Sequence, residues 1–460
     1  MGDRKGEESP FISSKKPVTL NPSWESQMQP DPNINGKGSV SMMSKIGASL
    51  QQPPLDKYKI VFLIFMLHGL GTLMPWNMFI TAKSYFEDFK LNNTIKTETK
   101  YSENFMQNMG FAAQIPNVLF NWINIFINLG GDLTSRIVYT ILLEIVILIV
   151  TVVLAMLDSY EWPGIFFWTT MCTVVIINMC NGIYQSTIYG LVASLPPKYT
   201  GAVVLGSNIS GCFCTIMSIL CSEFFESPRT SAIYYFVTAI LVLLLCFDTY
   251  FALPLNKFFR HYEMLSKQND KNSSASKTPL KVPYWQIFKK ASPQLFNIFF
   301  TFFVTLAVFP AVHSDIKRSD DFILGEKYFT LVTCFLTFNV FAMLGSLVTS
   351  WIQWPKPKFL VVPVVLRVAF IPLMILCNYN PNGLKRTLPV LISNEWVYWI
   401  IAIIMSFSSG YLSSLGMMYA PQTVNTKYQI TAGMFAAAFL VSGIFAGVLF
   451  SYLCPLFLTL

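Results

Sequence analysis

Amide side chains recur within stretches of this sequence that are otherwise apolar. Residues 163–195 contain no Asp, Glu, Lys or Arg, yet they include Asn178, Asn181 and Gln185. The spacing of these residues, i, i+3 and i+7, places all three amides on one face of a helix. Because an amide both donates and accepts hydrogen bonds, such a row can bind a polar solute or join neighbouring helices. Solute binding would make this helix face part of a site.

The stretch GLGTLMPWNMFITA, residues 69–82, carries a second set of such groups. Its two glycines allow another backbone or a ligand to come close, and Trp76 offers a flat face on which a ring can stack. Asn77, the next residue along, adds an amide. We therefore expect this helix face to meet a neighbouring helix or a cavity.

Further amides stand in two other apolar segments. Gln114 and Asn117 flank Pro116, and Asn339 lies within residues 328–353. Any one of these residues is explained equally well as a link between helices. Several amide rows on different helices favour a shared cavity, however, and we predict that this cavity binds a neutral polar solute.

No catalytic arrangement accompanies these amides in the sequence. It has no Gly-rich phosphate loop, no HExxH motif and no defensible nucleophile–His–acid set. The nine cysteines include no CxxC pair and are interpreted as small packing residues. We predict that the protein is not an enzyme and that it needs no metal and no cofactor.

The elements that carry these side chains are long apolar segments. Of the 460 residues, 53% are hydrophobic and 12% are charged, whereas a soluble protein is usually ~25% charged. Eleven segments are free or nearly free of charge and have about the 20 residues needed to cross a bilayer. They are 60–82, 104–129, 137–157, 163–195, 199–222, 229–250, 292–313, 328–353, 359–377, 396–419 and 429–457. We predict an all-α membrane protein with eleven transmembrane helices.

The Lys and Arg residues in the connections predict the orientation of the chain. We expect a disordered cytoplasmic tail at 1–54, a six-helix bundle at 55–252, a basic cytoplasmic linker at 253–291 and a five-helix bundle at 292–460. This 6+5 organisation, with a cavity between two bundles, is typical of a transporter. The net charge of +8 comes mainly from the cytoplasmic segments and does not indicate nucleic-acid binding.

Two prolines and one deep charge stand out within the predicted helices. Pro75 and Pro310 each lie late in the first helix of a bundle, where bends would form an external gate. The alternative is coincidence, since prolines are common in membrane helices. Arg367 lies deep within 359–377, and structural pairing and gating are equally open for it. In the first outer loop, Asn92 begins a sequon and is a candidate glycosylation site.

Several of these segments together resemble the equilibrative nucleoside transporter family. The motifs that carry the resemblance are GLGTLMPWNMFITA (69–82), IYQSTIYGLVASLPPKYTG (183–201), LPLNKFFRHY (253–262), FPAV (309–312), KYFTLVTCFLTFNVF (327–341), LRVAFIPLMILCN (366–378) and GYLSSLGMMYAP (410–421). The resemblance runs from about residue 55 to the end. It implies an eleven-helix major-facilitator-like fold that moves nucleosides, and sometimes nucleobases, by alternating access across the lipid bilayer. It also maps base contacts onto Leu73, Trp76 and Gln185, and further pocket positions onto Gln114, Asn117 and Asn181.

One departure from the family pattern concerns the sugar. After FLTFN the family has an Asp and, four residues later, an Arg, which hold the ribose hydroxyls; this chain has Ala342 and Ser346 there. Two hypotheses follow: a facilitative nucleoside or nucleobase transporter with an altered ribose site, or a member that has lost nucleoside transport and acts as a binding or regulatory membrane protein, or carries another polar solute. We expect the plasma membrane, with a lysosomal or other intracellular membrane as the alternative, and the sequence leaves the oligomeric state open.

Overall fold

The regular elements in the described part of the chain are helices, and two isolated β-bridges lie between them. The computed structural model describes residues 54–82, 85–91, 105–127, 132–158, 162–274, 282–318, 322–325, 329–381 and 386–458. Its main helices are α2 (Ile60–Thr81), α4 (Phe105–Phe126), α5 (Leu133–Met156), α6 (Pro163–Ala193), α7 (Pro197–Phe224), α8 (Pro228–Ala252), α9 (Lys257–Ser274), α10 (Tyr284–Val308), α11 (Ala311–Ser314), α13 (Thr337–Val348), α14 (Val361–Leu366), α15 (Phe370–Ile375), α16 (Glu395–Tyr419) and α17 (Gln429–Ser451). The predicted tail up to Pro53 and the sequon at Asn92 lie outside the described residues.

Short helical turns complete the described elements. They are η1 (Lys57–Lys59), η2 (Tyr85–Leu91), η3 (Leu253–Leu255), η4 (Leu331–Leu336), η5 (Arg367–Ala369), η6 (Ala420–Thr423), η7 (Thr426–Tyr428) and η8 (Cys454–Leu458). Two of them, η2 and η4, are π-helical. Since η4 runs directly into α13, and η5 joins α14 to α15, two of the predicted apolar segments are irregular helices rather than straight ones.

Nine helical segments within the described residues are long and apolar enough to cross a membrane. The prediction of an all-α membrane protein is therefore confirmed. The predicted segments 104–129 and 359–377 coincide with α4 and with the run Val361–Ile375, neither of which is among the nine. Several amides lower the hydropathy of α4, and Val361–Ile375 is short.

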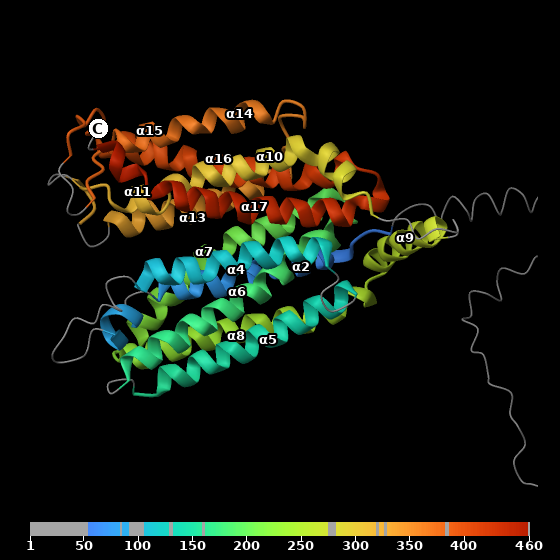
Figure 1. Cartoon of the computed structure of the whole chain (residues 1–460), viewed down its shortest axis with the longest axis horizontal. Helices are drawn as coiled ribbons and strands as arrows, with labels where there is room; N and C mark the ends of the chain where they lie inside the picture. The colour runs from blue at the N-terminus through green and yellow to red at the C-terminus, as the bar shows by residue number, and fades with distance from the viewer. Residues whose placement is uncertain are drawn as a thin grey trace, which may run out of the picture. The chain divides into compact units, whose positions relative to one another are not determined.

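The helices from Ile60 to Ala252 pack with one another, and so do those from Tyr284 onward (Figure 1). In the first bundle α2 packs on α7, α4 on α6, and α5 on both α6 and α8. In the second bundle α10 packs on α16 and α17, and α13 on α16. The bundles meet where α4 and α6 contact α17, and where α7 contacts α13 and α16. Elements that line this junction are therefore drawn from both halves of the sequence.

Glycine allows α2 and α7 to approach closely. A Cβ atom at Gly69 would lie 2.0 Å from the carbonyl oxygen of Val203, and one at Gly206 would lie 1.8 Å from that of Met66. Both distances are far inside van der Waals contact, so only glycine fits at either position. The Ser207 hydroxyl then donates a hydrogen bond of 3.0 Å to the Gly69 carbonyl. The GLG sequence thus fixes α2 on its neighbour rather than on a ligand.

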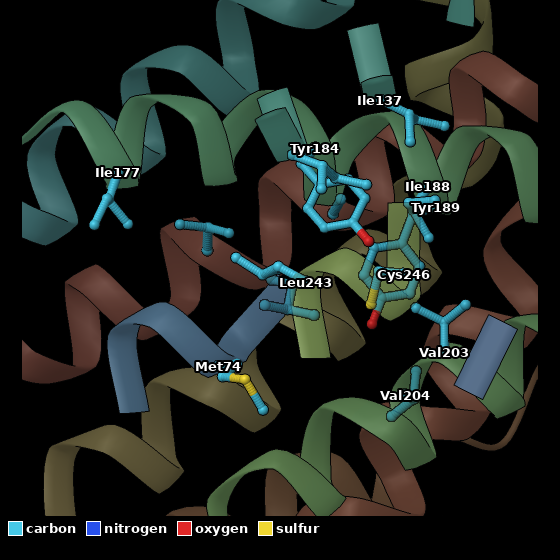
Figure 2. Packing of buried hydrophobic residues seen from close by; sticks show 14 of the residues in the cluster. Met74, Ile137, Ile177, Tyr184, Ile188, Tyr189, Val203, Val204, Leu243 and Cys246 are labelled. Atoms are coloured by element: carbon cyan, nitrogen blue, oxygen red, sulfur yellow. The ribbon is translucent and has the colours of Figure 1, made fainter. Parts of the chain in front are cut away.

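Another face of α2 packs into the apolar core of the first bundle. Figure 2 shows Met74 among buried side chains that include Tyr184, Leu243 and Cys246. His68, also fully buried, shares a hydrogen bond of 2.6 Å between its Nδ1 and the Tyr184 hydroxyl. His68 thus belongs to the packed interior of the first bundle. The side chains of α2 that do not enter this core are those available for a site.

Within the segment predicted as a cytoplasmic linker, the structure contains a further helix and a helix start. The amphipathic α9 occupies Lys257–Ser274, and α10 begins at Tyr284, before the charge-free run does. The first turns of α10 therefore carry Lys289 and Lys290, in keeping with a helix that begins outside the apolar layer. At its other end α10 stops at Val308, immediately before the Phe309–Pro310 pair.

Candidate functional site

A cavity of about 160 Å³ lies between the two bundles. Its wall combines amides, hydroxyls and aromatic rings, and among the described residues that line it none is charged. The lining residues are Leu73, Trp76, Asn77, Gln114, Asn117, Gln185, Ser207, Asn208, Gly211, Phe302, Thr305, Leu306, Phe309, Phe338, Asn339, Ser409, Ser413, Val441 and Ile444. Seven of the positions predicted from the sequence are thus brought together in one cavity.

Helix α2 contributes Leu73, Trp76 and Asn77 to this wall. They are half-buried, whereas their neighbours Met74 and Pro75 are buried in the first bundle. This alternation follows from helical geometry, because residues three and four apart share a face. The Asn77 side chain donates a hydrogen bond of 3.1 Å to the Ser210 hydroxyl on α7, which orients the amide at the edge of the cavity.

Helices α4 and α6 supply three more amides. The side-chain oxygens of Gln114 and Asn117 are buried and have no hydrogen-bond partner among the described residues. Gln185 is 1% exposed, and its Oε1 lies 3.5 Å from the Asn121 Nδ2, at the limit of hydrogen bonding. An unpaired buried amide oxygen is costly. This side of the cavity therefore presents acceptors that a ligand or water would satisfy.

The second bundle supplies hydroxyls and rings. The hydroxyl oxygens of Thr305 on α10 and Ser409 on α16 are 2.9 Å apart. The rings of Phe309 and Phe338 stack with their centroids 3.8 Å apart. Asn339 packs against Gly211 of α7, where a Cβ atom would lie only 2.1 Å from its Oδ1. Asn339 thereby sits at the seam between the bundles.

Arg367 lies directly behind this second wall. Its side chain is 2% exposed and its guanidinium donates to the Thr305 hydroxyl at 2.7 Å and to the Met405 carbonyl at 3.0 Å. It also donates to the Ser408 hydroxyl. All of these partners are neutral, so the cation is held by dipoles. The sequence left two interpretations open for Arg367, structural pairing and gating. These hydrogen bonds describe structural pairing and do not test gating.

The comparisons with known proteins agree with this geometry. A family model described as nucleoside transporter matches residues 171–456. Human equilibrative nucleoside transporter 1 is 32% identical and aligned over 87% of this chain and 98% of its own length. The chain belongs to the equilibrative nucleoside transporter family. Rat equilibrative nucleoside transporter 3 is also similar, at 30% identity over 81% of this chain and 84% of its own length.

Solved structures with a similar fold include a proton:xylose symporter of the major facilitator superfamily. It superposes with a TM-score of 0.57 at 9% sequence identity, covering 86% of this chain and 87% of that one. The human organic anion transporter MFSD10 superposes with a TM-score of 0.50 at 13% identity, covering 88% and 95% of the two chains. At such low identity these likenesses concern the fold alone, and they make the fold of this nucleoside transporter family member major-facilitator-like.

Three of the predicted binding positions lie outside the cavity of this family member. Asn181 is buried in α6, and neither its Oδ1 nor its Nδ2 has a partner among the described residues. Ala342 and Ser346 lie on α13 beyond Asn339, where α16 covers them. A Cβ atom at Gly410 of α16 would be 1.9 Å from the Ala342 carbonyl oxygen. Ser346 donates within its own helix, to the Met343 carbonyl at 2.9 Å.

Other cavity residues were not anticipated from the sequence. Ser207 and Asn208 on α7, Thr305 on α10, and Ser409 and Ser413 on α16 all line the wall of the cavity. A signal existed for the two α16 serines, because they are four residues apart in an apolar segment. Isolated hydroxyls carry less information than amides, since a Ser or Thr in a helix can bond its own backbone.

Beyond the cavity, the bundles are in close contact at one end. A Cβ atom at Gly190 of α6 would lie 2.9 Å from the Met434 side chain of α17, and one at Gly201 of α7 would lie 3.2 Å from the Met418 sulfur of α16. Both glycines flank the turn between α6 and α7.

The described residues contain no group of three or more His, Cys, Asp or Glu side chains that could hold a metal ion.

Proposed function

We propose that this protein is a facilitative transporter of nucleosides, nucleobases or both, working by alternating access. The observation that carries the proposal is the single cavity into which Trp76 and Gln185 project from one bundle and Thr305 and Ser409 from the other. An aromatic face, an amide and hydroxyls suit a flat heterocycle with mixed donors and acceptors. The relatives named as equilibrative nucleoside transporters support this substrate class.

In this proposal Trp76 and Leu73 form the apolar wall for the base. Gln185 pairs with its edge, and the unpartnered oxygens of Gln114 and Asn117 accept its N–H groups. The sugar contacts Asn77 and Asn339, and the hydroxyls of the second bundle face the base from the opposite wall. Asn181, Ala342 and Ser346 would join the site only when the helices have moved. The alternative of a member that no longer transports gains no specific support, because the base-contacting groups share a cavity.

The small volume of the cavity implies that the two bundles move relative to each other when substrate enters. Sites for drug-sized ligands usually enclose about 300–1,000 Å³, and the present cavity of about 160 Å³ is smaller. The bundles must therefore separate to admit a nucleoside. We infer that the contacts of Gly190 with Met434 and of Gly201 with Met418 close the cytoplasmic side. Bends at Pro75 and Pro310 would then open and close the outer side.

The proposed topology has eleven spans in a 6+5 arrangement, with α4 and the run Val361–Ile375 added to the nine apolar segments. The N-terminus is then cytoplasmic and the C-terminus lies outside. We propose the plasma membrane as the location. Asn92 would carry a glycan, which a glycosidase should remove with a shift in gel mobility that Asn92→Gln abolishes.

Uptake into proteoliposomes tests the function. The purified protein should take up radiolabelled uridine or adenosine above empty vesicles, and Gln185→Ala should lower this excess by about tenfold, the loss expected for an unpaired base edge. Asn178→Ala is the matched control, since Asn178 is an amide of the same helix that bonds the Val174 carbonyl at 2.9 Å and does not line the cavity. Uptake at the level of empty vesicles for every nucleoside and nucleobase would refute the proposal.

A further inference from the structure

The environment of Arg367 carries an inference about substrate charge, which rests on the proposed function. A guanidinium remains charged in a protein interior, and a buried charge without a counter-charge is expensive. All the hydrogen-bond partners of Arg367 in the described part of the chain are neutral oxygens, and its guanidinium also lies 5.7 Å from the centroid of the Phe370 ring. The membrane-embedded second bundle therefore holds a positive charge for which these residues provide no compensating carboxylate.

Hydrogen-bond direction links this charge to the cavity. Because a guanidinium has only donors, the Thr305 oxygen must accept from Arg367. The Thr305 proton then has two acceptors within reach, the Thr301 carbonyl at 2.7 Å and the Ser409 hydroxyl at 2.9 Å. When it goes to Ser409, the Ser409 proton is free to point into the cavity, which Ser409 lines. The chain Arg367–Thr305–Ser409 is then polarised from the cation toward the ligand.

The described wall of the cavity carries no negative charge that would offset the positive charge of Arg367. Its lining residues are neutral, and the α13 position at which the family resemblance implies an aspartate is Ala342. In a water-poor cavity an uncompensated cation nearby favours negative charge and electron-rich acceptors. It disfavours cationic ligands for the same reason.

We propose that this site prefers nucleosides whose base carries a negative charge, and that Arg367 sets the preference as a positioning residue through Thr305 and Ser409. The acceptor oxygen of an anionic base binds the Ser409 hydroxyl, and the Arg367 charge stabilises it from behind. Neutral nucleosides still bind by their shape and through the amides of the first bundle. A preference for anionic over neutral bases of the same shape is the measurable signature.

Xanthosine and guanosine are suitable probes, because the base of xanthosine is anionic at neutral pH and that of guanosine is neutral. Each would compete with radiolabelled uridine for uptake into proteoliposomes. We expect xanthosine to inhibit at concentrations about tenfold lower than guanosine, equivalent to ~1.4 kcal/mol. Thr305→Val keeps the side-chain shape and removes the relay, so it should bring the two inhibition constants close together. Arg367→Gln should do the same, and Arg367→Lys should keep part of the preference.

Thr173→Val is the matched control, because Thr173 donates within its own helix to the Thr170 carbonyl, has no other hydrogen-bond partner among the described residues and lies outside the cavity. It should leave the ratio of the two inhibition constants unchanged. A native protein that does not distinguish the probes, or a ratio that survives Thr305→Val, would overturn the inference. If no nucleoside or nucleobase is taken up, the proposed function fails instead. Thermal-shift binding of xanthosine and guanosine then decides the inference by the same ratio.

Discussion

Ala342 and Ser346 occupy the two positions of α13 at which the family resemblance implies ribose-binding residues. The variant Ala342→Asp tests whether these positions face α16 rather than the cavity. Ala342 is 2% exposed and Ser346 is 1% exposed. A Cβ atom at Gly410 on α16 would lie 1.9 Å from the backbone carbonyl oxygen of Ala342, so α16 packs tightly against α13 at this point. A carboxylate at 342 would be almost completely shielded from solvent. Ala342→Asp is therefore expected to destabilise the second bundle rather than to repair a sugar site.

The magnitude follows from the burial. An uncompensated buried charge costs about 3–5 kcal/mol, which is roughly a 100- to 5,000-fold change in the ratio of folded to unfolded protein. Asn339→Asp is the matched control, since it adds the same charge one helical turn away, at a half-buried residue that lines the cavity. It should lose far less stability. Ala342→Asp combined with Ser346→Arg should recover part of the loss, because the two charges can pair on one helix face.

Fluorescence-detected size-exclusion chromatography after heating measures these differences in detergent. The expected order of stability is native, Asn339→Asp, the double variant, and Ala342→Asp last. Uridine uptake by the double variant should not exceed that of the native protein. If Ala342→Asp is as stable as Asn339→Asp, or if the double variant takes up uridine faster than the native protein, then the side chain at position 342 faces a hydrated cavity. The conclusion that it packs against α16 would then be wrong.

Two further predictions concern helix contacts. Gly69→Ala should lower the melting temperature strongly, because its Cβ atom would lie 2.0 Å from the Val203 carbonyl oxygen. Gly110→Ala is the control, because its Cβ atom meets nothing within 4 Å and the change should leave the stability unchanged or raise it by up to ~1 kcal/mol through helix propensity. Equal melting temperatures for the two variants would contradict this prediction. Trp122→Phe removes the bond of 2.9 Å from the indole Nε1 to the Ser442 hydroxyl between the bundles, so it should lower the free energy of unfolding by about 1 kcal/mol. A lower melting temperature in detergent would show this loss, and an unchanged melting temperature would contradict it.

Much of the fold was predictable because apolar length and loop charge are local properties of the sequence. The amides were equally visible, since Gln185 or Asn117 in an apolar segment requires a partner. Which way a side chain faces depends on its neighbours, however. Asn339 and Ala342 belong to the same row on α13, yet only Asn339 reaches the cavity, because Gly410 brings α16 against the next turn. No periodicity in α13 alone contains that information.

The same reasoning explains why the hydroxyl wall was missed and why it matters. Thr305 and Ser409 lie far apart in the sequence and meet only when α10 packs on α16, with Arg367 behind them. The first bundle offers the unpaired amide oxygens of Gln114 and Asn117, and the second offers a polarised donor. A base has both N–H groups and acceptors, so one ligand can satisfy both walls at once. If each wall moves with its own bundle, as the proposed alternating access requires, binding such a ligand would stabilise the conformation in which the bundles are drawn together and so couple recognition to the closing step of transport.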